Sequence, residues 1–278
     1  MKTALVAASL AILGCGNDVQ PAGADADQGT VDTAPPADAP ETVTDVMADV
    51  TTDTTWSGLV RVKSSISIVG GVTLTVLPHT RIQIAAGDVI NVAGTVNING
   101  VKGGVVTIEN LVANENWNAF TVSTGTLAMN YVVQTGGGFG ISGSGHLSVR
   151  DSQFSHVTHD LLVVSAGTVD MQYSWIGVAD GQPDTTHCDM HFEGGSPTIT
   201  VSHSNISTSA YGVMLYAGTG VDFTYNNWFG NSADISETSG PPVTADLSNG
   251  WFKSGNPNLS GLTKNNMATA QVTTSGPR

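Results

Sequence analysis

The 278-residue chain is poor in positive charge: nine Lys and Arg residues stand against 23 Asp and Glu, a formal net charge of −14. This balance argues against a basic patch, so we expect no nucleic-acid partner. Two cysteines, Cys15 and Cys188, cannot provide a disulfide framework. The apolar run from Ala4 to Leu13 is too short to span a membrane. No ten-residue stretch carries a capped helical stripe, which argues against a helical fold.

Apolar residues instead recur at a fixed spacing of 22 residues. The step relates four pairs, Leu74 and Val96, Leu147 and Val169, Ile199 and Val221, and Asn205 and Asn227. Alternating apolar positions indicate short strands, and 33 glycines suit tight turns between them. This repeat predicts an all-β parallel β-helix solenoid with about 22 residues per coil. A step of 30 residues from Val169 to Ile199 predicts a projecting loop around residues 179–186.

Two stretches carry a family resemblance. Residues 71–80 with 90–95, and residues 204–206 with 226–231, resemble the opening and closing coils of right-handed parallel β-helix proteins of the pectin-lyase-like superfamily. The resemblance implies this fold over residues 56–262, with Asn205 and Asn227 stacked as an asparagine ladder. Many proteins with this fold cleave polysaccharides. The chain lacks the neighbouring aspartate pair of polygalacturonases and the Gly-His-Gly and Arg-Ile-Lys motifs, so no catalytic residue is carried over.

The two ends of the chain predict a tethered surface protein. Residues 1–14 form a lipoprotein signal peptide, and Ile12-Leu13-Gly14-Cys15 resembles the bacterial lipobox, which implies a lipid anchor at Cys15. We therefore expect a membrane-anchored protein of the bacterial cell envelope, in the outer membrane or at the cell surface. Residues 15–54, rich in Asp, Ala, Thr and Pro, predict a disordered acidic tether. The β-helix domain then spans residues 55–262, and residues 263–278 predict a loose tail.

One predicted strand, residues 186–193, carries the densest set of reactive side chains. Strand alternation sends Cys188 and the apolar residues inward. It sends four polar residues to the outer face, His187, Asp189, His191 and Glu193. Alignment with residues 160–163 places Asp160 beside Asp189, with the carboxylates about 4.8 Å apart.

Three interpretations of this patch remain open. Asp160, Asp189 and His191 would provide catalytic acid and base groups for glycoside cleavage. Alternatively, Asp160, Asp189 and Glu193 would bind Ca²⁺, or His187, Asp189 and His191 would bind Zn²⁺, so a metal site centres on Asp189, His187 and Glu193. The third interpretation is a solvated strand face whose charges satisfy each other.

Substrate contacts are expected beside this strand. Asp180 and Asp184 lie in the projecting loop, and Tyr216 falls on the strand face of His191. The sequence therefore favours an envelope protein that recognises or processes polysaccharide, as a lyase or glycoside hydrolase if it is an enzyme. The alternative is a noncatalytic structural or adhesive surface protein, with or without a stabilising metal.

Overall fold

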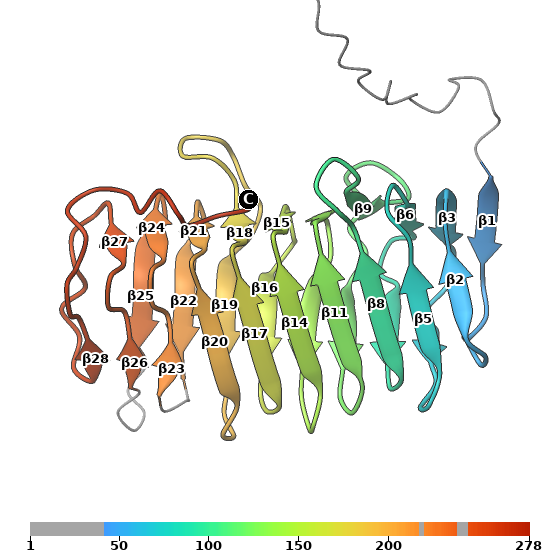
Figure 1. The fold of residues 1–278 in the computed structure, drawn as a ribbon, viewed down its shortest axis with the longest axis horizontal. Helices are drawn as coiled ribbons and strands as arrows, with labels where there is room; N and C mark the ends of the chain where they lie inside the picture. The colour runs from blue at the N-terminus through green and yellow to red at the C-terminus, as the bar shows by residue number, and fades with distance from the viewer. Residues whose placement is uncertain (1–41, 217–219, 238–243) are drawn as a thin grey trace, which may run out of the picture. The chain divides into compact units, whose positions relative to one another are not determined.

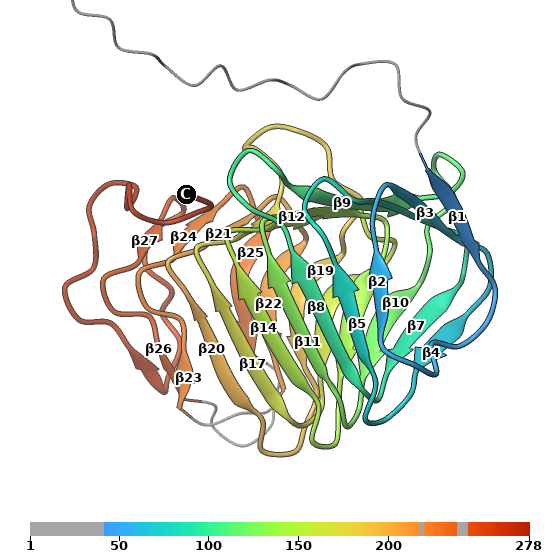
Figure 2. The same ribbon diagram turned by 45° about the vertical axis from the view of Figure 1, so that its right-hand side comes forward.

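The computed structural model describes residues 42–216, 220–237 and 244–278. These residues form short parallel strands that wind as a right-handed β-helix with three long sheets, as predicted (Figures 1 and 2). No helix within these ranges could cross a membrane. The predicted signal peptide and Cys15 lie outside the described residues.

We call the three sheets A, B and C. A complete coil contributes one strand to each sheet, and the chain passes through them in the order C, A, B. Sheet A contains β1 (Val43–Val46), β3 (Leu59–Val62), β6 (Arg81–Ile84), β9 (Val106–Asn110), β12 (Val132–Thr135), β15 (Gln153–Ser155), β18 (Trp175–Gly177), β21 (Asn205–Ser207), β24 (Asn227–Phe229) and β27 (Trp251–Phe252). Sheet B contains β4 (Ile66–Ile68), β7 (Val89–Val92), β10 (Ala119–Val122), β13 (Gly138–Ile141), β16 (Asp160–Val164), β19 (Cys188–Phe192), β22 (Tyr211–Leu215) and β25 (Ala233–Glu237). Sheet C contains β2 (Thr54–Trp56), β5 (Thr73–Val76), β8 (Thr95–Asn99), β11 (Thr126–Asn130), β14 (His146–Arg150), β17 (Thr168–Gln172), β20 (Thr198–Ser202), β23 (Val221–Asp222), β26 (Ala245–Asp246) and β28 (Leu262–Thr263).

The 22-residue period becomes the pairing register of the coils. Leu74 pairs with Val96 and Leu147 pairs with Val169, as the repeat predicts. Alternate residues of most strands point inward and stack on apolar residues of the next coil, which builds one continuous apolar core. This burial explains why the alternation was readable in the sequence.

Polar ladders continue the stacking at the turns. Asn227 Nδ2 donates to Asn205 Oδ1 at 2.9 Å, which confirms the expected asparagine ladder. A second, buried ladder runs beside it, since the amide of Ser174 donates to Ser204 Oγ at 3.1 Å and that of Ser204 donates to Asn226 Oδ1 at 2.8 Å. These bonds satisfy turn amides that burial would otherwise leave without a partner.

The folded unit extends past both predicted boundaries. Val43 in β1 pairs with Leu59, so residues 43–46 belong to the first coil rather than to the tether. At the other end, the structure packs the segment expected to be loose: the Ala268 amide donates to the Gly250 carbonyl at 2.9 Å. Backbone hydrogen bonds hold both of these terminal segments to the coils, and the spacing of apolar residues in the sequence does not predict such bonds.

Candidate functional site

The connections from sheet A to sheet B differ in length between neighbouring coils. Residues 111–118 join β9 to β10, and residues 178–187 join β18 to β19, the projecting loop that the sequence predicted (Figure 1, yellow). Between them, β12 reaches β13 through only Gly136 and Gly137. A two-residue turn between longer loops leaves a hollow on this edge.

Two glycines make this turn, which we call the floor of the hollow, because larger residues would not fit at either position. Gly136 has φ +96°, and a Cβ there would lie 2.0 Å from Asn110 Oδ1. A Cβ on Gly137 would lie 2.3 Å from the ring of Trp117. The buried Trp117 folds over this turn, and its Nε1 donates to the Thr135 carbonyl at 3.0 Å.

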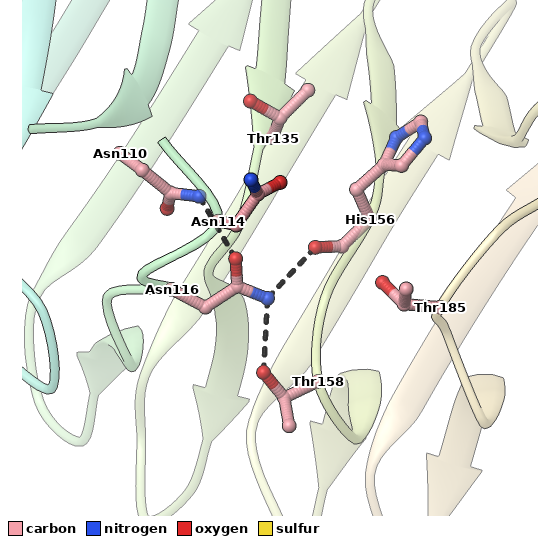
Figure 3. Close-up of a pocket in the computed structure, with 7 residues that line it drawn as sticks. All are labelled: Asn110, Asn114, Asn116, Thr135, His156, Thr158 and Thr185. Carbon is pink, nitrogen blue, oxygen red and sulfur yellow. Dashed lines mark hydrogen bonds between the residues drawn. The ribbon is translucent and has the colours of Figure 1, made fainter. Parts of the chain in front are cut away.

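Above the floor lies a cleft of about 510 Å³ (Figure 3). It is lined by amide, hydroxyl and imidazole side chains, from Asn110, Asn114, Asn116, Thr135, His156, Thr158 and Thr185. Asn116 holds the two walls together, because its Nδ2 donates to the His156 carbonyl and to Thr158 Oγ1, both at 2.9 Å. No hydrogen bond within the described residues uses the side chains of Asn114 or Thr185.

Two smaller hollows extend this cleft onto sheet B. The first, of about 230 Å³, shares Asn116 and Thr158 with the cleft and reaches His159 and Asp160. The second, of about 220 Å³, also contacts Asp160. It continues along β13 and reaches Val163 in the neighbouring strand β16. We call the three joined hollows the turn groove.

Asp160 lines the turn groove and also contacts His187 and His191, two histidines that were predicted from the sequence as site residues. Its Oδ1 lies 3.0 Å from His187 Nδ1, and its Oδ2 lies 2.7 Å from His191 Nδ1. Tyr216 lies against His191, with ring centroids 4.9 Å apart. Four residues that the sequence assigned to different roles, Asp160, His187, His191 and Tyr216, therefore lie together, and an imidazole oriented by a carboxylate is suited to proton transfer.

The predicted alignment of Asp160 with Asp189 is wrong by one residue. Asp160 pairs with Cys188, and Val163 pairs with His191, so the register differs by one residue from the expected one. Asp189 is fully buried inside the coil, and neither carboxylate oxygen has a hydrogen-bond partner among the described residues. Burial raises the pKa of Asp189 well above 3.8. The predicted outward pair of Asp160 and Asp189 is therefore wrong.

The predicted metal centre loses its central ligand for the same reason. Asp189 lies in the interior, whereas Glu193 is exposed and His187 bonds to Asp160. Among the described residues, no group of three or more His, Cys, Asp and Glu side chains could hold a metal ion. The Ca²⁺ and Zn²⁺ sites proposed from alternation are not assembled.

The two loop aspartates make protein contacts. Asp180 forms an ion pair with Lys253. Asp184 Oδ1 accepts from the amides of His156 at 2.8 Å and Thr185 at 2.7 Å, so it ties the projecting loop to the wall of the cleft. Asp184 therefore shapes the turn groove rather than facing it.

Cys188 is a structural residue, as its inward position predicted. Its Sγ donates to the Met190 carbonyl at 2.7 Å, and burial raises the pKa of the thiol to about 12. A thiol with this pKa is not a nucleophile at neutral pH.

The asparagines of the 111–118 loop were not predicted as site residues. The sequence nevertheless contains a sign of this loop. Leu127 pairs with Val96, which lies 31 residues earlier, and this spacing is nine residues longer than one 22-residue coil. Comparison with protein-family models, curated proteins and solved structures finds no match for this chain.

Proposed function

We propose that the chain binds polysaccharide in the turn groove. The observation that supports this proposal is the run of three joined hollows, of which the largest is lined by side-chain amides and hydroxyls and the other two add Trp117, Phe139, His159 and Asp160. Sugar hydroxyls both donate and accept hydrogen bonds, and Asn and Thr side chains can do the same. The groove crosses several coils, so it suits an extended chain better than a compact ligand.

The resemblance to pectin-lyase-like proteins supports the same ligand class. Many proteins with that fold act on polysaccharides, although their catalytic motifs are absent here. The lipobox-like sequence at Cys15 adds a lipid anchor to the proposal, which would hold the groove at the bacterial cell envelope, close to surface glycans. Fold resemblance contributes less than the groove chemistry, because one fold serves many functions.

Removal of the two unpaired polar groups of the cleft is expected to weaken glycan binding. The double variant Asn114→Gly, Thr185→Val should lose about ten- to thirtyfold in affinity, since each lost hydrogen bond contributes about 1 kcal/mol. Glycine is chosen because Asn114 has φ +63°. Calorimetry against a panel of neutral and acidic polysaccharides measures the change.

The matched control is Asn249→Gly. Asn249 also has φ +63° but lies outside the turn groove, so this variant should bind as the wild type does. Equal affinity of the double variant and the wild type would contradict the proposal. Binding of no polysaccharide at all would favour the structural or adhesive alternative.

The pair of Asp160 and His191 gives a second candidate, polysaccharide processing. Their 2.7 Å contact at the end of the turn groove is the specific observation that favours it. The same panel, assayed for new reducing ends and unsaturated products, tests this function. Turnover that Asp160→Asn abolishes without loss of binding would support an enzyme, and absence of turnover would leave a binding protein.

A further inference from the structure

The turns from sheet C to sheet A display a ladder of flat side chains. Tyr131, Asp151, Tyr173, His203 and Tyr225 occupy equivalent turns, all with positive φ between 48° and 60°. This conformation is uncommon for residues other than glycine, and it is unfavourable for tyrosine in particular. The rings stack, with centroids 4.9 Å apart for Tyr173 and His203 and 4.5 Å apart for His203 and Tyr225. We call these five residues the turn ladder.

Asp151 interrupts the ladder, and Arg278 fills the gap. Arg278 Nε lies 2.9 Å from Asp151 Oδ1 and Nη2 lies 3.0 Å from Oδ2, a bidentate pair. The guanidinium carbon lies 3.7 Å from the centroid of Tyr173. Carboxylate pairing and ring stacking together suit a planar guanidinium and do not suit an ammonium group. Asp151 and Tyr173 therefore form an arginine slot.

Residues 272–278 lie across the ladder as a strap. The Asn227 side chain accepts from the Val272 amide at 2.8 Å and donates to the Val272 carbonyl at 3.0 Å. The Gly276 amide donates to the His203 carbonyl at 2.8 Å. In Figure 1 this red segment returns along the coils to a point beside β18. The strap thus connects coils that are far apart in the sequence.

We propose that the strap is a latch that acid opens, and that opening exposes an arginine slot able to bind an arginine side chain of an extended peptide. In the closed state, the Arg278 side chain of the strap occupies the slot. The contacts of the strap are hydrogen bonds, one ion pair and the stacking of Arg278 on Tyr173, and no apolar residue of the strap is inserted into the core. Such a segment can leave without disturbing the β-helix.

His203 provides the acid response because it lies beneath the strap. The Tyr173 and Tyr225 rings cover its two faces, Ser202 Oγ lies 3.4 Å from its Nδ1, and Asp222 and Arg278 are the charged groups that act on it. Burial lowers the pKa of His203 below 6.5, Asp222 opposes this, and Arg278 lowers it further.

The direction of the response follows from this lowered pKa. Opening removes Arg278 and part of the burial, so the open state binds a proton more readily than the closed state. The closed latch is therefore fully favoured above about pH 6.5 and is weakened as the pH falls through that value. Neutral His203 closes the latch, and protonated His203 favours release.

Hydrogen exchange of the full chain at pH 7.5 and 5.5, corrected for intrinsic rates, tests the latch. We expect the wild-type amides of residues 272–278 to lose protection several-fold in acid. Asp151→Asn should remove their protection at both pH values, and His203→Gln should keep it at both. Asp45→Asn, which breaks the Lys63–Asp45 ion pair in the first coil, is the matched control. Protection of the β17 amides in each variant shows that the coils remain folded.

A peptide-binding experiment tests the arginine slot directly. The variant Arg278→Ala vacates it, and the peptide of residues 272–278 should then bind at least about tenfold more tightly than the same peptide with lysine in place of arginine. Addition of Asp151→Asn should abolish this preference. Wild-type protection that does not change with pH would overturn the acid latch, and equal binding of the two peptides would overturn the arginine slot.

Discussion

Replacement of Asp189 by leucine is expected to stabilise the chain at neutral pH by about 1–3 kcal/mol, the cost of a buried polar group that is left without a hydrogen bond. Asp189 is fully buried, and both oxygens lack a hydrogen-bond partner within the described residues. The Ser209 hydroxyl beside it donates to Asn231 Oδ1 at 3.1 Å, and its proximity to Asp189 only partly offsets the rise in the pKa of Asp189 that burial causes. One coil earlier, the corresponding position holds the buried Leu161, so the interior accepts leucine at this level.

The gain should depend on pH. Because burial raises the pKa of Asp189, the folded chain keeps this proton to a higher pH than the unfolded chain does. Its contribution to stability is complete below about pH 3.8 and is lost as the pH rises through the folded-state pKa. The advantage of leucine is therefore smallest in acid and grows with pH.

Urea denaturation at pH 4, 6 and 8 measures this difference in the free energy of unfolding. The control is Glu193→Gln, which neutralises an exposed carboxylate close in sequence and should change stability by less than about 0.5 kcal/mol. If leucine instead destabilises the chain at every pH, the Asp189 carboxylate has a favourable partner, and its burial serves the fold.

The repeat made the fold predictable. Each coil must place its inward residues over those of the previous coil, so the pairing of Leu147 with Val169 appears in the sequence as a fixed spacing. The stacking of Asn205 on Asn227 follows from the same spacing. These features depend on local alternation and one period, and both can be read from a single chain.

The candidate site was less predictable because loops set it. Across the projecting loop, the expected register placed Asp160 beside Asp189, but Asp160 pairs with Cys188. Strand alternation also breaks in β19, where Cys188, Asp189 and Met190 are all buried, and this break places Asp189 in the interior. His187 and His191 still reach Asp160, because side chains of this length span the one-residue difference.

Contacts between distant segments could not be predicted at all. Arg278 and Asp151 are 127 residues apart, and neither position has an apolar pattern that connects them. The strap is held by polar contacts with turns, so hydrophobic periodicity suggested a loose tail. The turn groove is intermediate, since the nine extra residues before β11 could have revealed a loop, although not the two-residue turn beside it.

That two-residue turn gives the second large expected effect. Gly137→Ala should lower the free energy of unfolding by about 1–3 kcal/mol, the cost of an overpacked site, and should weaken glycan binding at the same time. The added Cβ would lie 2.3 Å from the Trp117 ring, and Trp117 must move because the contact is with a rigid ring system. Trp117 lines the middle of the turn groove and packs edge-on against Phe120 at 5.3 Å.

Urea denaturation, tryptophan fluorescence and calorimetry with the bound polysaccharide measure the three consequences together. The matched control lies in β13, the strand that follows the turn: a Cβ on Gly140 meets only Thr121 Cγ2 at 3.7 Å, an ordinary contact. Gly140→Ala should therefore keep wild-type stability within about 0.5 kcal/mol. If Gly137→Ala shifts the tryptophan emission and lowers stability but binds glycan normally, the ligand does not occupy the floor of the groove. Binding would then be confined to the cleft around Asn114 and Thr185.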